Sequence, residues 1–116
     1  MSQVIIALGS NTRQSAHIQW ASERLACLMN NVVMSRKIWT TDVHGNGYMY
    51  LNRLLLGNTT LTPRALEDTF KRMEAETGRT GQQVTIDLDL MQYGSQRFHL
   101  KDWPRPYIQK LLPDIL

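Results

Sequence analysis

The stretch 85–91 has the side-chain alternation of a β-strand with one apolar face and one acidic face. Successive strand residues point to opposite sides of a sheet, so Asp87 and Asp89 share one face while the isoleucine and leucines around them share the other. Such a strand is half-buried, because its apolar face needs a covering layer and its acidic face does not. The chain is therefore expected to build a sheet that packs against helices on one side.

The two carboxylates of this strand point to phosphate chemistry. Neighbouring carboxylates repel each other and lose hydration on burial, unless a cation lies between them. Mg²⁺ prefers hard oxygen ligands and typically binds through one or two carboxylates together with substrate phosphates. Asp87 and Asp89 are therefore candidate magnesium ligands, and a solvated acidic strand face is the alternative interpretation.

Apolar runs and helical stripes place the other elements around this strand. The clearest helix begins after the N-cap residue Thr62, with Pro63 in its first turn, and closes at Gly78. Strands are expected at 4–8, 32–40, 48–56 and 85–91, helices at 15–29 and 62–78, a short edge strand at 95–99, and a last helix from Pro104 or Pro106. This βαββαβ order predicts one α+β domain over residues 1–116. Its expected form is a ferredoxin-like sandwich, with an antiparallel sheet, helices packed on one face and a short C-terminal extension.

Composition narrows the class of partner. The 116 residues are 42% hydrophobic, enough for one globular core, and the net charge of +3 mildly favours an anionic ligand. No run of interleaved basic and aromatic residues indicates a nucleic-acid surface. The single Cys27 excludes an intrachain disulfide, and the sequence has neither a signal-peptide pattern nor an apolar run of membrane-spanning length. We therefore expect a cytoplasmic protein with no nucleic-acid or membrane partner; the sequence does not predict its oligomeric state.

Four short segments together resemble one enzyme family. They are Ala7–Asn11, Tyr50–Asn52, Glu74–Arg79 and Asp87–Asp89. Their order and spacing are similar to those of the 6-hydroxymethyl-7,8-dihydropterin pyrophosphokinases, and the likeness runs from Val4 to about Gly94 and fades beyond. The resemblance implies a folate-pathway enzyme that moves the terminal diphosphate of ATP to the hydroxymethyl group of the reduced pterin and releases AMP.

The resemblance assigns the metal and nucleotide roles residue by residue. Asp87 and Asp89 resemble the carboxylates that hold Mg²⁺ against the triphosphate, and Arg79 would act beside them as a catalytic residue. The residues implied to bind ATP are Glu74, Arg79 and His99; Arg105 is added as a candidate for its charge and late position in the chain. Arg79 at a helix end has an alternative role as a partner of the helix dipole.

The pterin side of the expected site lies on and beside the first three strands. Tyr50 and Asn52 resemble the family's pterin-contacting aromatic residue and amide; an amide offers both a donor and an acceptor to the pterin edge. The residues implied to bind the pterin are Gly9, Ser10, Thr40, Thr41, Tyr50 and Asn52, with His44 as a candidate cap. Cross-strand packing is the alternative role for Tyr50.

The chain departs from the family between the Gly-Arg pair and the aspartates. The family carries a long mobile loop there, with further arginines and a tryptophan that covers the pterin, whereas this chain has only residues 80–85. Two functions therefore stay open: a compact, Mg²⁺-dependent enzyme with weakened activity, or an impaired relative that binds pterin or nucleotide or serves as an interaction module. We hypothesise that Trp103 and Arg105 replace the missing cover and charge.

Overall fold

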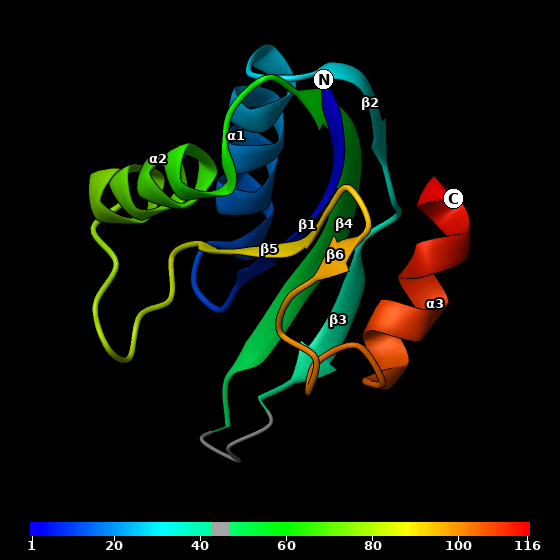
Figure 1. Ribbon diagram of the computed structural model, residues 1–116. Coiled ribbons are helices and arrows are strands. Elements are labelled where there is room, and N and C mark those ends of the chain that lie inside the picture. The colour runs from blue at the N-terminus through cyan, green and yellow to red at the C-terminus, as the bar shows by residue number, and fades with distance from the viewer. Residues whose placement is uncertain (43–46) are drawn as a thin grey trace.

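The computed structural model describes residues 1–42 and 47–116. Its elements follow the chain in the order strand, helix, three strands, helix, two strands, helix (Figure 1). They are β1 (Ser2–Ser10), α1 (Gln14–Cys27), β2 (Asn30–Met34), β3 (Ile38–Thr41), β4 (Met49–Thr59), α2 (Pro63–Glu76), β5 (Asp87–Tyr93), β6 (Gln96–Arg97) and α3 (Pro106–Ile115). The candidate cap His44 lies outside the described residues.

The sheet confirms the predicted ferredoxin-like order. Its strands run β2–β4–β1–β5–β6, and β3 also pairs with β4. Each of these pairings is antiparallel. The central strand β1 therefore has β4 on one side and β5, with its two aspartates, on the other.

Two layers cover the two faces of the sheet. Helices α1 and α2 pack on one face, as predicted, whereas α3 lies against the other (Figure 1). Alternation along β1 divides its side chains between the two cores: Ile6 packs with α1 and α2, and Ile5 packs with α3. The sequence predicted a C-terminal helix but not the face that it covers. The face of the sheet that was expected to be open is therefore partly covered by α3, which forms a second buried core with it.

The boundaries of α2 follow from capping, as predicted. The Thr62 hydroxyl accepts a hydrogen bond from the backbone N–H of Ala65 at 3.1 Å, and Pro63 occupies the first turn. Gly78 follows the helix with a φ of +78°, a left-handed conformation that suits glycine. None of the helices in the described part of the chain is long and apolar enough to cross a membrane.

The prediction of one continuous strand at 32–40 is wrong. Two strands, β2 and β3, replace it, and residues 35–37 between them belong to neither strand. The buried Ser35 hydroxyl accepts from the Leu54 N–H at 2.8 Å and donates to the Arg36 carbonyl at 2.7 Å. The Ser35 side chain therefore satisfies the backbone N–H of Leu54 at the break. The pattern of apolar residues in the sequence does not reveal such a bond.

Candidate functional site

A row of three residues crosses the middle of the sheet. Gly9 on β1 is paired in register with Asn52 on β4 and with Asp87 on β5. In the next row on the same face, Ala7 lies opposite Asp89. The smallest side chains thus lie on the central strand, between an amide on one side and two carboxylates on the other. This arrangement leaves space above β1 for a ligand close to the backbone.

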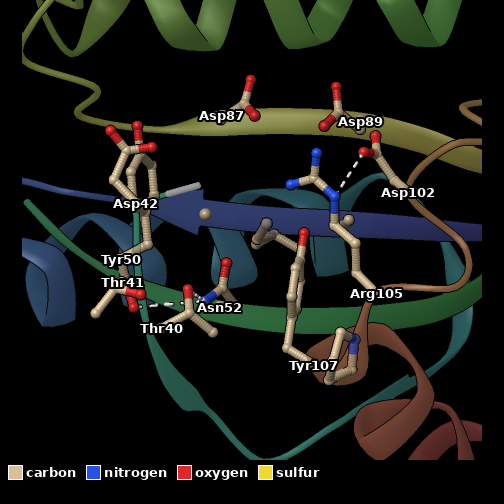
Figure 2. A pocket seen from close by; sticks show the side chains of 14 residues that line it. Thr40, Thr41, Asp42, Tyr50, Asn52, Asp87, Asp89, Asp102, Arg105 and Tyr107 are labelled. Carbon is tan, nitrogen blue, oxygen red and sulfur yellow. Dashed lines mark hydrogen bonds and ion pairs between the residues drawn. The ribbon is translucent and has the colours of Figure 1, made fainter. Parts of the chain in front are cut away.

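A pocket of about 530 Å³ occupies that space. Most of the residues predicted to bind the pterin line it: Gly9, Thr40, Thr41, Tyr50 and Asn52. The structure also places Asp87, Asp89, Asp102, Arg105 and Tyr107 around it (Figure 2). Ser10 is not among the lining residues, because alternation turns its buried side chain to the other face of β1, where its hydroxyl donates to the Thr12 carbonyl.

The Asn52 amide is held by the protein and presents its oxygen to the pocket. Its Nδ2 donates to the Thr40 hydroxyl at 2.8 Å and to the Ile38 carbonyl at 3.1 Å. Its Oδ1 lies above Gly9, where an added methyl carbon would be 3.5 Å away. Since the neighbours use the donors, this amide offers the pocket an acceptor in a fixed position.

Aromatic rings lie on either side of Asn52. Tyr50 comes from β4 and Tyr107 from the first turn of α3 (Figure 2). Burial raises the pKa of both phenols, so both stay neutral in the physiological range. Two rings and a floor of small residues suit a flat ligand. Tyr107 was not predicted as a site residue, although an aromatic residue at the start of a terminal helix is a usable indication.

A second, smaller pocket lies on the other side of the aspartates. Its volume is about 220 Å³, and it is lined by Glu74, Arg79 and His99, three of the residues predicted to bind ATP. Asp87 and Asp89 line this pocket as well as the larger one. The fourth predicted residue, Arg105, lies in the larger pocket, where its Nε is 3.0 Å from the Asp102 carboxylate. The carboxylates of Asp87 and Asp89 thus lie at the boundary between the two pockets.

The surroundings of Asp89 disfavour its charged form. Burial, followed by repulsion from Asp87, raises the pKa of Asp89 to about 7, and His99, at 3.8 Å, acts in the opposite direction. Paired oxygen donors in this electrostatic state fit a Mg²⁺ ion. No cluster of three or more histidine, cysteine or acidic side chains that could hold a metal occurs in the described ranges. Further ligands would therefore have to come from water or a substrate.

Arg79 links the second pocket to the carboxylates. Its Nη1 is 2.8 Å from Glu74 Oε2 and 3.0 Å from Asp87 Oδ1. Glu74 also accepts the backbone N–H of Leu88 at 3.1 Å, so it ties α2 to β5. Burial raises the pKa of Glu74, although both of these contacts favour its charged form. Arg79, predicted to bind ATP, is therefore held in an ion-pair network with two carboxylates.

The hypothesis that Trp103 covers the pocket is wrong. Its side chain is buried in the core beneath α3, and its indole N–H donates to the Phe98 carbonyl at 2.9 Å. The guanidinium of Arg97 stacks over the ring, 4.0 Å from its centroid. Trp103 thus anchors the segment before α3, and Tyr107 is the C-terminal aromatic residue that reaches the pocket.

Asp89→Asn should stabilise the metal-free protein in mildly alkaline solution. The folded-state pKa of Asp89 lies at about 7, above its ordinary value of 3.8, so the folded state binds the proton more tightly than the unfolded chain does. Wild-type stability should fall as the pH rises between these values and stay low above them, whereas the variant loses this dependence. Thermal unfolding with a chelator, at about pH 5 and about pH 8, measures the difference. The exposed Asp68→Asn serves as the control, and a lower melting temperature of Asp89→Asn than of the wild type at the higher pH would contradict the expectation.

Comparison with known proteins gives two matches. The profile of a family described as 7,8-dihydro-6-hydroxymethylpterin-pyrophosphokinase matches residues 5–115. A curated protein of Aquifex aeolicus (strain VF5), named 2-amino-4-hydroxy-6-hydroxymethyldihydropteridine pyrophosphokinase, is 30% identical over 121 residues. That alignment covers 95% of this chain and 74% of the relative. The likeness expected to fade beyond Gly94 therefore continues through α3.

Proposed function

Because the chain belongs to the 7,8-dihydro-6-hydroxymethylpterin-pyrophosphokinase family, we propose that it transfers diphosphate from ATP to 6-hydroxymethyl-7,8-dihydropterin and releases AMP. The observation that supports this proposal most strongly is the pair of pockets that share Asp87 and Asp89. A diphosphotransferase needs room for two substrates, with the charged transfer group between them. The shared carboxylates lie where such a group would pass from one substrate to the other.

The larger pocket suits the pterin. Its small-residue floor and its two tyrosines accept a flat bicycle, and the Asn52 oxygen accepts a hydrogen bond from a ring N–H or amino group. A pterin that contacts Asn52 with its ring would direct its substituent along the row toward Asp87. The attacking hydroxyl would then lie beside the carboxylates, as the transfer requires.

The smaller pocket suits the phosphates of ATP. In the reaction, the hydroxymethyl oxygen forms a bond to the β-phosphorus and loses its proton to water. The bond from that phosphorus to the oxygen bridging to the α-phosphate breaks, so AMP leaves. Arg79 is placed to contact phosphate oxygens if it exchanges one of its carboxylate partners for them. Mg²⁺ held by Asp87 and Asp89 would neutralise charge on the transferred group. His99 borders the same pocket and adds a donor when protonated.

A second function, binding without turnover, has two observations in its favour. The connection between Arg79 and Asp87 is short and supplies no further arginine. Arg79 itself is engaged by Glu74 and Asp87. Loss of charge stabilisation at a transferring phosphoryl group lowers rates by orders of magnitude. An impaired relative would therefore keep the pterin pocket and lose the chemistry.

One assay separates the two functions. Purified protein is incubated with the reduced hydroxymethylpterin, ATP and Mg²⁺, and AMP is measured by chromatography. The enzyme should form AMP in proportion to the pterin consumed, and omission of the pterin or the metal should abolish it. Pterin binding with no AMP would reject the enzyme and support the binding protein. Neither AMP nor pterin binding would reject both.

A further inference from the structure

We propose that Asn11 is a positioning residue that couples the two pockets. This inference deepens the proposed function and rests on it. Asn11 follows β1 directly, and its side chain is almost fully buried, with 6% of its surface exposed. It lines neither pocket, so its action on a ligand would have to pass through its neighbours.

A single side chain holds two distant segments of the chain. Asn11 Oδ1 accepts the backbone N–H of Val84 at 2.8 Å, and Nδ2 donates to the Gln82 carbonyl at 3.1 Å. Nδ2 also donates to the Tyr50 hydroxyl at 3.4 Å. In addition, the Asn11 backbone N–H donates to the Val84 carbonyl at 2.9 Å. The end of β1 is thereby bonded to both the pterin-side tyrosine and the connection between α2 and β5.

The chemistry of these contacts requires an amide. The Val84 N–H needs an acceptor and the Gln82 carbonyl needs a donor, so the surroundings fix which end of the amide is oxygen. The second Nδ2 hydrogen is then directed at Tyr50. Aspartate would keep the acceptor and lose both donors, and alanine would lose all three side-chain bonds. These contacts therefore favour asparagine at position 11 over aspartate, which has nearly the same size.

The anchored connection borders the phosphate side of the site. It follows α2, which ends at Glu76, and reaches β5 at Asp87. Arg79, near its start, has its side chain 3.0 Å from that of Asp87. Its turn is closed by two further bonds, from the Thr80 N–H to the Gln83 carbonyl and from the Gln83 N–H to the Thr80 hydroxyl, each 3.0 Å. Asn11 ties this turn to the sheet. The connection thus joins two residues that line the smaller pocket, Arg79 and Asp87, and Asn11 helps to fix its position.

The test combines steady-state kinetics with amide hydrogen exchange. Asn11→Ala should raise the KM for the pterin about five- to tenfold, the range expected when one or two neutral hydrogen bonds that orient a wall are lost. Its kcat per folded molecule should change less. The Val84 amide should exchange faster in Asn11→Ala, because its acceptor is gone. The exposed Asn30→Ala serves as the matched control and should leave all of these values unchanged.

Tyr50→Phe isolates the link to the pterin pocket. It should raise the pterin KM by a smaller factor and leave Val84 exchange as in the wild type. In the double variant, the pterin KM should match that of Asn11→Ala, because the shared bond is already lost. The proposal would be overturned if the two substitutions raised the pterin KM independently, so that their factors multiplied in the double variant. It would also be overturned if the pterin KM of Asn11→Ala lay within twofold of the wild-type value.

Asn11→Asp and equilibrium binding of the pterin provide two further tests. If Asn11→Ala does not fold, Asn11→Asp replaces it; this variant should raise the pterin KM while Val84 exchange stays slow, and an unchanged KM would reject the coupling. If the wild-type protein makes no AMP, the proposed enzyme function fails on its own. Equilibrium binding of the pterin then replaces KM. Unchanged pterin affinity in Asn11→Ala would then overturn the proposal for Asn11.

Discussion

Asp87→Ala is expected to lower turnover by about a thousandfold while the affinity for the pterin changes little. Asp87 borders both pockets and supplies one of the two carboxylates that would hold Mg²⁺. Its loss removes charge stabilisation at the transferred group. The groups proposed to contact the pterin ring, Tyr50 and Asn52, lie on β4, where the substitution leaves the Asn52 hydrogen bonds in place.

Measurement of AMP formation and of pterin binding on the same preparation tests this expectation. Asp68→Ala, which removes an exposed carboxylate on α2, is the matched control and should behave as the wild type does. Raising the Mg²⁺ concentration should not restore the rate. The variant lacks a carboxylate that would bind the metal, so additional Mg²⁺ cannot replace it. Turnover within tenfold of the wild type would show that Asp87 is not a required metal ligand.

Leu111→Ala should give the largest loss of stability among simple α3 substitutions. Its side chain is fully buried, with 0% exposed, in the core that α3 forms with β1 and β4. Truncating a buried leucine to alanine typically lowers the free energy of unfolding by about 2–5 kcal/mol, from lost burial and from the cavity left behind. This is a large fraction of the stability of a domain of this size.

Urea denaturation followed by circular dichroism measures this loss. The control is Leu116→Ala, the same change at a residue with 81% of its surface exposed, which should shift the midpoint by little. Because Tyr107 and Arg105 enter the larger pocket from the start of the same helix, the destabilised variant should also lose pterin affinity near its unfolding midpoint. Equal midpoints for the two variants would mean that α3 does not bury Leu111 in solution.

Local patterns predicted most of the fold. The alternation around Asp87 and Asp89 and the caps of α2 depend on neighbours in sequence, and each has a direct physical meaning. The break between β2 and β3 was missed, and the hydrogen bond found there joins Ser35 to Leu54, a residue distant in sequence. The place of α3 was missed because an amphipathic helix shows which face it buries but not the surface that receives it.

Long-range contacts also limited how much of the site could be predicted from the sequence. The resemblance indicated Asn52 and Asp87, and the register shows that Gly9 lies between them. The role of Asn11 depends on bonds to residues 39 and 73 positions away, which no local pattern contains. Trp103 was misassigned because its aromatic chemistry suits a cover as well as a core, and only packing separates the two.

In the proposed complex, the row of Asn52, Gly9 and Asp87 fixes the distance from the pterin ring to the carboxylates. Adjacent strands are spaced about 4.8 Å apart, so the backbones of β4 and β5 are separated by about twice that distance. Backbone hydrogen bonds maintain this span, and side-chain motion alters it little. A pterin analogue with a longer arm between ring and hydroxyl would therefore be expected to bind at Asn52 yet overshoot the carboxylates.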